Sequence, residues 1–465
     1  MIRFLNAYFP ARTLLLGASE AFLVTFGFVA AAVARLGMSQ ANLMLNYQRG
    51  FLKIVVVAAV FTVCMYYFDL YDSWVCSNKR EVLTRLVQVF GTVCILMAVL
   101  YYVFPLLQLG REIFFIGFIF VALLLVVLRQ LFMTVNAMPK FAERALILGD
   151  GPLAKPLMTE IETRAELGIR VVGQLSENGT HPANPADEVL GTGRYERLSE
   201  QVEAFHANRI IIAMGERRGR LPIEALLQLK GRGVRIQDGA EIYEAITGKL
   251  PVECLRLSWL LFSPGFQVSR FLLIYKRTFS LVVSLVGIVV TTPLMALIAV
   301  AIRLDSPGPV VFRQKRVGQG GAIFTLYKFR TMLDGADRDG RHKPAEAMDA
   351  RFTRVGGLLR RTRLDELPQL FNILCGDMYF VGPRPFVPDQ EQECLEKIPH
   401  YSQRWAVKPG ATGWAQINRG YNATIEDNVE KLAYDLFYIK NMSVGLDLLI
   451  LFKTTKTLIL GRGSR

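Results

Sequence analysis

The stretch FSLVVSLVGIVVTTPLMALIAVAI, residues 279–302, is almost wholly apolar and decides the architecture of the chain. A helix of this length could cross a bilayer core of about 30 Å, which takes roughly 20 residues. Thr291, Thr292 and Pro293 lie at its middle, where proline removes a helix donor and threonine hydroxyls can bond freed carbonyls. Basic residues flank both ends: Arg270, Lys276, Arg277, Arg303, Arg313, Lys315 and Arg316. We expect a re-entrant helix over about 279–303, broken at Thr292 and Pro293, with a transmembrane helix as the alternative.

Four more apolar runs precede this stretch, at 13–34, 51–70, 86–107 and 112–135. Each is long enough for a transmembrane helix, and the first lacks the small-residue site of a cleaved signal peptide. We expect Glu20 and Asp69 to lie at the interface or to snorkel rather than to form an ion pathway. Basic residues favour cytoplasmic ends for the bundle: Arg3, Arg12, Lys79, Arg80, Arg85, Lys140 and Arg144. Arg35, Arg49, Lys53 and Arg111 make this bias modest.

The next segment, 144–250, has the pattern of a Rossmann-like α/β domain. Apolar runs at 145–148, 171–172 and 209–213 are typical of buried parallel strands. Gly149, Gly151 and Ala154 form a G-x-G-x-x-A turn after the first strand. No acidic residue follows cleanly about 20 positions on, and Pro152 interrupts the helix start. A structural or regulatory domain is therefore favoured over a working NAD site.

The segment RTRLDELPQL, residues 361–370, carries the pattern of phosphoryl chemistry. Asp365 could attack a phosphoryl group, and Glu366 could hold Mg²⁺ with water and substrate oxygens. Arginines nearby could neutralise a diphosphate: Arg360, Arg361, Arg363 and Arg384. The alternative is a helix cap at Asp365 with a solvated Glu366.

Lys328 and Arg330 alternate with aromatic residues, so on a strand both would point to one face, where they could bind phosphate. A merely solvated strand face is the alternative. Asp334 and Asp337 are candidates to assist a metal, although surface acids are at least as plausible from the sequence. Residues 446–460 predict an amphipathic helix in the membrane surface, with a core helix as the alternative, and Trp414 is expected to be interfacial.

Composition supports a membrane enzyme with phosphorylated substrates. The chain has 465 residues, of which 52% are hydrophobic, so about three domains are expected. Its formal charge of +14 fits anionic headgroups and phosphates, since no RNA-binding motif accompanies the basic residues. Six scattered cysteines and four scattered histidines lack metal-site spacing, so we expect reduced thiols and no zinc.

About the last 190 residues resemble the bacterial sugar transferases, which are monotopic polyprenyl-phosphate phosphoglycosyltransferases. The ordered blocks that carry the resemblance are KRTFS at 276–280, LDSPGPV at 304–310, FRQKRVG at 312–318, LYKFRTM at 326–332, RVG at 354–356, LRRT at 359–362, LDELPQ at 364–369, GDM at 376–378, VGPRP at 381–385 and VKPGATGWAQ at 407–416.

The resemblance implies a two-step mechanism. Asp365 would take the phosphosugar from a UDP-sugar and release UMP, and Glu366 would bind Mg²⁺. The family's re-entrant helix breaks at a Ser-Pro pair, where this chain has Thr292 and Pro293. Lys276 and Arg277 would then sit at lipid phosphates. Ser280 stands where the family usually has Asp. We expect this replacement to affect a structural contact at the helix entrance rather than the chemistry.

Larger members of this family carry similar α/β domains between four membrane helices and the catalytic part. The segments 216–220, 238–253, 434–442 and 461–463 look like the subgroup associated with PEP-CTERM and exosortase exopolysaccharide systems. The larger relatives also imply a homodimer.

Together these observations predict four transmembrane helices at 1–140, a Rossmann-like domain at 141–255 and a monotopic, α-rich catalytic domain at 256–465. The expected enzyme moves a hexose 1-phosphate from a UDP-sugar to undecaprenyl phosphate, and the subgroup implies glucose or galactose as the sugar. Its expected place is the bacterial inner membrane, with the catalytic domain facing the cytoplasm and no nucleic-acid partner. The alternative is a membrane-tethered, NAD-dependent nucleotide-sugar dehydratase or epimerase, which lacks a Tyr-x-x-x-Lys pair after Gly149.

Overall fold

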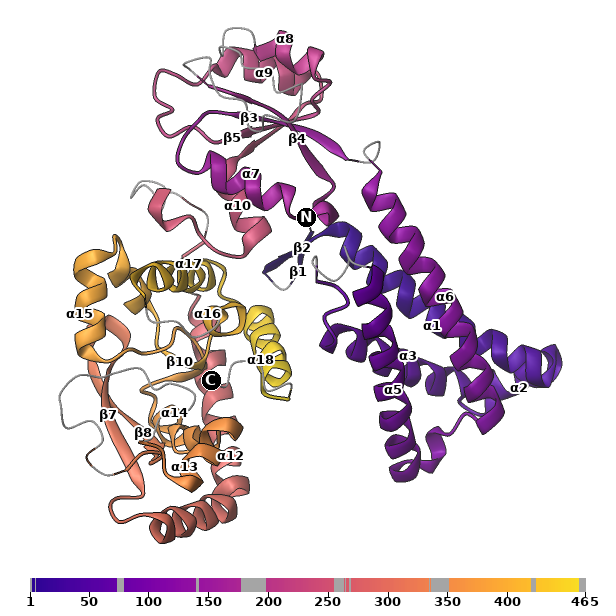
Figure 1. Cartoon of the computed structure of the whole chain (residues 1–465), viewed down its shortest axis with the longest axis vertical. Helices are drawn as coiled ribbons and strands as arrows, with labels where there is room; N and C mark the ends of the chain where they lie inside the picture. The colour runs from indigo at the N-terminus through magenta and orange to yellow at the C-terminus, as the bar shows by residue number, and fades with distance from the viewer. Residues whose placement is uncertain are drawn as a thin grey trace. The chain divides into compact units, whose positions relative to one another are not determined.

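The computed structural model describes residues 2–4, 6–72, 79–138, 142–176, 198–254, 263, 265–266, 269–333, 335, 351–419 and 424–459 (Figure 1). The chain divides into two compact units, one built on Phe9–Ile242 and one on Arg3–Tyr8 and Tyr243–Arg465. Lys140, Asp334 and Asp337, which entered the sequence predictions, lie outside the described residues. The division at 140 and 255 stays a prediction, because compactness groups the membrane helices with the α/β domain.

Apolar helices form the first part of the first unit and confirm the four predicted runs. They are α1 (Ala11–Leu36), α3 (Gly50–Tyr67), α5 (Lys79–Val103) and α6 (Arg111–Ala137). A shorter helix, α2 (Met38–Tyr47), follows α1 and was not predicted, because its polar residues give no apolar run. All four long helices have the length and hydropathy of membrane spans, and Phe28, Phe61 and Val121 lie in their shared core.

Both acidic residues singled out in the sequence analysis form ion pairs in this bundle. Glu20 is fully buried and pairs with Arg129 at 2.5 Å, while Asp69 pairs with Arg85 at 3.0 Å. The expectation that Glu20 snorkels is therefore wrong. A buried carboxylate needs a partner, and Arg129 on a neighbouring helix supplies it.

A four-stranded parallel sheet forms the α/β part and confirms the predicted strands. Its order is β4-β3-β5-β6. The elements are β3 (Glu143–Leu148), α7 (Ala154–Glu162), η3 (Ala165–Leu167), β4 (Ile169–Leu175), α8 (Leu198–Ala204), β5 (Arg209–Ile212), α9 (Ile223–Gly231), β6 (Arg235–Asp238) and α10 (Gly239–Thr247). Leu146 and Leu148 pack with α8 and α9, whereas Ile147 packs with α7, so helices cover both faces (Figure 1).

The glycines of the G-x-G-x-x-A turn are explained by packing within the domain. Gly149 has φ +113°, a region that favours glycine. A Cβ on Gly151 would lie 2.5 Å from the Ala213 carbonyl oxygen, so the turn packs directly on the segment after β5. This packing alone requires the small residues, and nucleotide binding is not needed to account for them.

The described part of the second unit combines helices with three small two-stranded sheets. Its elements are β2 (Ala7–Phe9), which pairs with β1 (Ile2–Phe4), then η5 (Val252–Cys254), α12 (Arg270–Asp305), β7 (Val311–Val317), η6 (Gln319–Gly321), β8 (Ile323–Phe329), α13 (Arg354–Thr362), η7 (Leu364–Glu366), α14 (Gln369–Cys375), β9 (Tyr379–Val381), α15 (Pro388–Lys397), η8 (Tyr401–Ala406), β10 (Gly410–Thr412), α16 (Trp414–Asn418), α17 (Ile425–Asn441) and α18 (Val444–Ile459). β7 and β8 are antiparallel, and β9 and β10 are parallel. Ile302 of α12, Phe329 of β8 and Leu359 of α13 share one core cluster.

Helix α12 contains the stretch that opened the sequence analysis. It is one uninterrupted helix with Pro293 inside it, and its ribbon changes direction along its length (Figure 1). Thr291 and Thr292 donate to the Gly287 and Ile288 carbonyls, which are not the carbonyl left by proline. Many of its apolar side chains are exposed, Val290 at 70% among them. Membrane re-entry stays a prediction.

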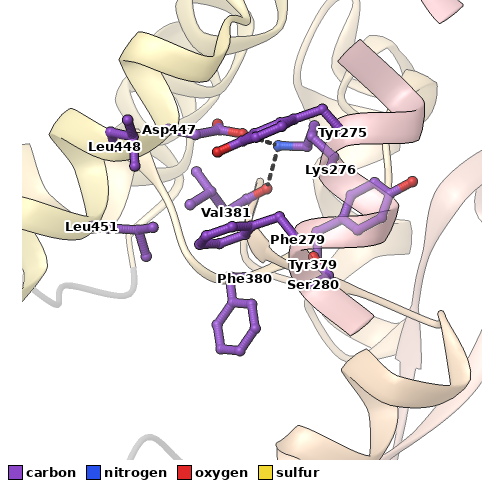
Figure 2. A pocket seen from close by; sticks show the side chains of 10 residues that line it. All are labelled: Tyr275, Lys276, Phe279, Ser280, Tyr379, Phe380, Val381, Asp447, Leu448 and Leu451. Atoms are coloured by element: carbon purple, nitrogen blue, oxygen red, sulfur yellow. Dashed lines mark hydrogen bonds and ion pairs between the residues drawn. The ribbon is translucent and has the colours of Figure 1, made fainter. Parts of the chain in front are cut away.

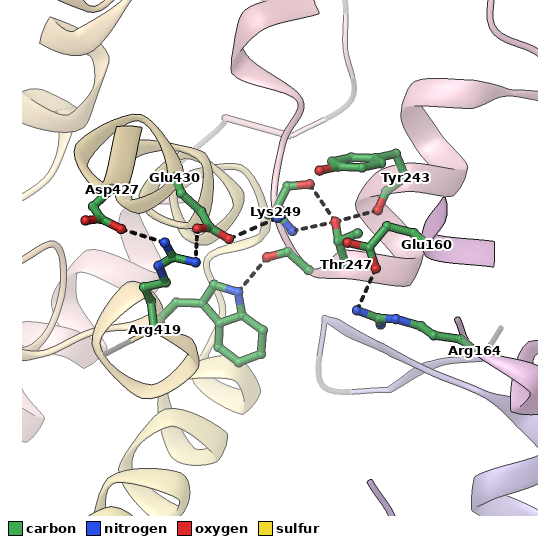
Figure 3. A network of polar contacts seen from close by, with 10 residues as sticks. Glu160, Arg164, Tyr243, Thr247, Lys249, Arg419, Asp427 and Glu430 are labelled. Carbon is green, nitrogen blue, oxygen red and sulfur yellow. Dashed lines mark hydrogen bonds and ion pairs between the residues drawn. The ribbon is translucent and has the colours of Figure 1, made fainter. Parts of the chain in front are cut away.

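Residues that follow α10 pack within the second unit, although the sequence analysis assigned them to the α/β domain. Figure 3 shows Lys249 on Glu430 of α17, at 3.0 Å, and Arg419 between Glu430 and Asp427. The Trp414 indole donates to the Gly248 carbonyl at 2.7 Å. These contacts fix the segment 248–254 against the C-terminal helices.

Candidate active site

The two adjacent carboxylates lie on η7, a short turn between α13 and α14. Thr353 caps α13 by accepting a hydrogen bond from the Gly356 amide at 2.9 Å. Arg363 then adopts a left-handed conformation with φ +56°, which ends α13 and redirects the chain. Asp365 and Glu366 follow at once, so the helix end fixes where both carboxylates lie. The alternative of a helix cap at Asp365 finds no support, because the N-cap positions of α13, η7 and α14 are Thr353, Arg363 and Pro368.

Glu366 is held by two cations from distant segments. Lys328 Nζ lies 3.0 Å from Glu366 Oε1, and Arg384 Nη2 lies 3.3 Å from the same oxygen. Burial by itself raises the pKa of the Glu366 carboxyl, but the charges of Lys328 and Arg384 outweigh burial and hold the pKa at about 2. The carboxylate is therefore ionised at every physiological pH.

Asp365 is 9% exposed and lies among the same charges. Burial raises the pKa of its carboxyl above the ordinary value. The positive charges of Lys328, Arg360 and Arg384 oppose this rise, whereas the negative charge of Glu366 adds to it. A partly desolvated carboxylate among cations is well suited to attack an anionic phosphate, because the cations offset charge repulsion.

Asn372 fixes the strand that presents Lys328, and the sequence analysis missed it. The side chain is fully buried on α14. Its amide oxygen accepts from the Tyr327 amide at 3.0 Å, and its amide nitrogen donates to the Thr325 carbonyl at 2.7 Å. The only sequence signal is a polar residue within an apolar helix, which does not reveal its partners.

The predicted arginines divide into those near the carboxylates and those away from them. Arg384 contacts Glu366, and Arg360 acts on Asp365 while lying 4.5 Å over the Phe352 ring. Arg361, the next residue along α13, is exposed, and its role stays a prediction.

Arg330 was expected to share one face of a strand with Lys328, but its side chain bonds backbone carbonyls instead. It follows the end of β8, and its guanidinium donates to the Ser306 and Pro307 carbonyls at 2.7 and 2.8 Å. The side chain is buried at 5% exposure. Lys328 and Arg330 are therefore not equivalent, and phosphate binding by Arg330 stays untested.

Lys276 is buried inside the unit, so its expected place at lipid phosphates is wrong. Figure 2 shows its ammonium directed at Asp447 and the Val381 carbonyl, at 2.7 and 3.0 Å. The Tyr438 hydroxyl lies 2.6 Å away. The sequence placed Lys276 correctly at the start of the apolar helix but could not show that a carboxylate on α18 would pair with it.

Arg277 also contacts protein groups. Its guanidinium donates to the Ile373 and Leu374 carbonyls at 3.0 and 2.9 Å, so it caps the C-terminal end of α14. Unlike Lys276, Arg277 is only partly buried, and the headgroup role predicted for it stays a prediction.

Ser280 lines the small pocket of Figure 2 beside Lys276 and Asp447. It is buried at 2% exposure, one helical turn after Lys276. The carboxylate that pairs with Lys276 thus comes from Asp447 of α18, not from residue 280. The structural contact expected at position 280 stays a prediction.

Trp414 and α18 complete the C-terminal part of the unit. Trp414 is 6% exposed and stacks on Phe437, with ring centroids 5.5 Å apart, so its expected interfacial position is wrong. The predicted helix at 446–460 is confirmed as α18. Leu446 and Ile450 are fully buried, and its place in a membrane surface stays a prediction.

The donor set fits Mg²⁺ only in part. Among the residues that the structure describes, no group of three or more His, Cys, Asp or Glu side chains converges. Mg²⁺ is usually held by one or two carboxylates plus waters and substrate phosphates, and Asp365 and Glu366 could provide those. The fit therefore depends on substrate oxygens.

A buried carboxylate, a second carboxylate held by cations and a long apolar helix define a membrane-associated site suited to phosphoryl transfer. Residues 271–461 match the model of the bacterial sugar transferase family, and residues 66–236 match that of a CoA-binding domain. The chain belongs to the bacterial sugar transferase family, since it also covers 94% of a relative at 40% identity.

That relative is the exopolysaccharide production protein PSS of Rhizobium leguminosarum bv. phaseoli, matched over 39% of this chain. The UDP-N-acetylgalactosamine-undecaprenyl-phosphate N-acetylgalactosaminephosphotransferase of Aeromonas hydrophila is 43% identical over 48% of this chain and 52% of its own length. The undecaprenyl-phosphate glucose phosphotransferase of Komagataeibacter xylinus is 33% identical over 70% of this chain and 60% of its own length. The chain thus spans little more than half the length of these two relatives.

Proposed function

We propose that this protein transfers a sugar 1-phosphate from a UDP-sugar to undecaprenyl phosphate, releases UMP and starts an exopolysaccharide repeat unit. The observation that carries the proposal is the placement of Asp365 beside Glu366, within the field of Lys328, Arg360 and Arg384. The names of two relatives support the substrate classes, since both name undecaprenyl phosphate as a substrate.

The first step joins a carboxylate oxygen of Asp365 to the phosphorus that carries the sugar. The bond from that phosphorus to the bridging oxygen breaks, and the oxygen leaves with UMP. In the second step an oxygen of undecaprenyl phosphate attacks the aspartyl phosphosugar and Asp365 leaves as a carboxylate. The product retains a diphosphate linkage, so the glycosidic bond is never broken.

The cations of the site would stabilise the charge that builds up on the transferring phosphate. Arg384 and Lys328 already face a carboxylate, and an anionic diphosphate would compete for them. Mg²⁺, when bound with Glu366 and substrate oxygens, would add further positive charge at the diphosphate.

The membrane arrangement follows from the same proposal. We place the catalytic unit on the cytoplasmic face of the inner membrane, with α12 re-entering the bilayer near Pro293, because the exposed apolar residues of α12 need a hydrophobic environment. The PEP-CTERM and exosortase subgroup and the homodimer belong to this proposal as well.

A membrane-tethered dehydratase or epimerase is the weaker candidate. The turn at Gly149 and Gly151 is explained by its packing on Ala213, and no Tyr-x-x-x-Lys pair follows it in the sequence. Such an enzyme would also leave the carboxylates and cations of the second unit without a role.

The test is UMP release by the purified full chain with undecaprenyl phosphate and Mg²⁺. UDP-glucose, UDP-galactose and UDP-N-acetylgalactosamine are assayed separately, because the relatives differ in the sugar that they name. Wild type is compared with Asp365→Asn and with Asp389→Asn, a control at an exposed aspartate of α15. We expect release from at least one donor, loss with Asp365→Asn and no change with Asp389→Asn. Normal turnover by Asp365→Asn would reject the mechanism.

A further inference from the structure

Arg404 is a buried charged side chain of the second unit with four hydrogen-bond partners, and the mechanism above gives it no role. It lies on η8 with only 4% of its side chain exposed. One guanidinium nitrogen donates to Glu391 at 2.9 Å and to the Tyr401 hydroxyl at 2.6 Å. The other donates to Asp435 at 2.9 Å and to the Arg384 carbonyl at 2.9 Å.

The last of these contacts reaches the active site. Arg384 belongs to residues 382–387, which we name the arginine loop. Its side chain contacts Glu366, while its backbone carbonyl accepts from Arg404. Arg404 therefore holds the main chain of a residue whose side chain faces the carboxylates. The guanidinium of Arg404 also lies 4.5 Å over the Phe386 ring, so it contacts the loop at two points.

Neighbouring carbonyls of the arginine loop are held as well, but by groups from other elements. The Gly410 amide donates to the Pro383 carbonyl at 2.9 Å, Arg316 donates to the Pro385 carbonyl at 3.0 Å, and the Val317 amide donates to the Phe386 carbonyl at 3.1 Å. Prolines on both sides of Arg384 further restrict its backbone. Arg404 supplies the bond at the central residue.

The carboxylates fix Arg404 itself in place. Glu391 comes from α15 and Asp435 from α17, and both are almost fully buried. Lys431 and Tyr401 also act on this cluster, and burial raises the pKa of Asp435 to about 6. A guanidinium with five donors in a rigid fork can bond acceptors on several sides, which a lysine ammonium cannot do in the same geometry.

We propose that Arg404 is a positioning residue of the transfer reaction, which sets the orientation of Arg384 at the carboxylates by holding the backbone of the arginine loop. The inference rests on the proposed function, because Arg384 matters for activity only if a phosphate is transferred there. It also makes a claim about loop order that does not depend on turnover.

The test is a double-mutant cycle on kcat/KM for UMP release by the full chain. Arg404→Lys keeps the charge that the two buried carboxylates need, so the protein should still fold. We expect a loss of roughly 10- to 100-fold, as small displacements of a phosphate-binding group produce. The loss in kcat/KM should divide between kcat and KM in the same way as the loss caused by Arg384→Met.

Combining the two changes decides between positioning and general destabilisation. With Arg384→Met in place, Arg404→Lys should add little, because no guanidinium remains to be oriented. Phe437→Leu is the control. It removes a buried ring of α17 that stacks on Trp414, so it weakens core packing at a residue that does not hydrogen-bond the arginine loop. Its effect on kcat/KM should be small and should multiply with that of Arg384→Met. A multiplicative loss for Arg404→Lys would overturn the proposal.

Hydrogen–deuterium exchange of peptides that cover 382–387 gives a readout without turnover. Arg404→Lys should speed exchange in the arginine loop, whereas Phe437→Leu should leave it unchanged at equal unfolding temperature. Unchanged exchange in Arg404→Lys would overturn the proposal. If the wild type releases no UMP but Arg404→Lys still speeds exchange in the arginine loop, the result would count against the transfer function and not against the role of Arg404 in loop order.

Discussion

Lys328 Nζ lies 3.0 Å from Glu366 Oε1, and this pair joins β8 to the turn that carries Asp365. Glu366 keeps a pKa of about 2 although burial acts to raise it, since Lys328 and Arg384 lie close by. The pair therefore stabilises the fold and keeps a negative charge beside Asp365. Removing the cation should expose both effects.

We expect Lys328→Met to lower the free energy of unfolding at pH 7 by about 1–2 kcal/mol, because Glu366 loses its nearest cation. A carboxyl whose folded pKa is depressed stabilises the protein above its unfolded pKa, and this stabilisation disappears as pH falls toward the folded pKa. The difference between variant and wild type should thus shrink as pH falls below 4.5 toward 2. Thermal unfolding across this range measures it, with the exposed Lys315→Met on β7 as control. A difference independent of pH would contradict this origin.

Activity should rise with pH through the pKa of Asp365, because only the ionised carboxylate is a nucleophile. Burial raises that pKa above 3.8, so the acid limb of the kcat profile should lie above that value. Arg360→Met removes a charge that lowers the pKa, and should move the limb to higher pH. Arg361→Met, at the exposed neighbour, should leave it in place. A limb that does not move in Arg360→Met would argue against Asp365 as the titrating group.

Adjacent glycines of α13 should respond oppositely to the same change. A Cβ on Gly356 would lie 2.0 Å from the Thr331 carbonyl oxygen, whereas nothing lies within 4 Å of one on Gly357. Gly357→Ala should stabilise the protein by about 0.5–1 kcal/mol, since alanine favours helix. Gly356→Ala should destabilise it by more than 1 kcal/mol, in the usual range for overpacking. Unfolding temperatures of both variants in detergent test this pair, and equal shifts would contradict the close approach of α13 to Thr331.

Lys276→Met should destabilise the second unit by about 3–5 kcal/mol, because Asp447 would stay buried without its cation. The double variant Lys276→Met/Asp447→Leu should recover part of the loss. Unfolding in detergent measures both. If Lys276 instead bound lipid phosphates, the single variant would keep its unfolding temperature and lose affinity for anionic vesicles.

Local patterns predicted the elements well. Hydrophobic periodicity predicted the four apolar helices and the strands at Ala145, Val171 and Arg209, because the apolar pattern that leads to burial lies within each segment. The same logic placed Lys328 on a strand. Arg330 was expected on the same strand face as Lys328, but β8 ends at Phe329, one residue before it. The alternation of a strand does not extend past its end.

Contacts between distant segments could not be predicted from one sequence. Lys276 and Asp447 are 171 positions apart, and nothing near either residue names the other. Lys276 was expected at the lipid surface because a cation before an apolar helix usually snorkels. Arg404 was missed for the same reason, since the acceptors that it bonds come from α15, α17 and the arginine loop, which are distant in sequence.

The covalent aspartyl route is tested most directly by exchange of labelled UMP into UDP-sugar without undecaprenyl phosphate. The donor is the sugar that wild type accepts in the release assay, and Asp365→Asn and Asp389→Asn serve as variants. The two-step route predicts exchange with wild type and Asp389→Asn and none with Asp365→Asn, because the first step is reversible without the lipid acceptor. Exchange that appears only when undecaprenyl phosphate is present would contradict the route and favour direct transfer between the two substrates.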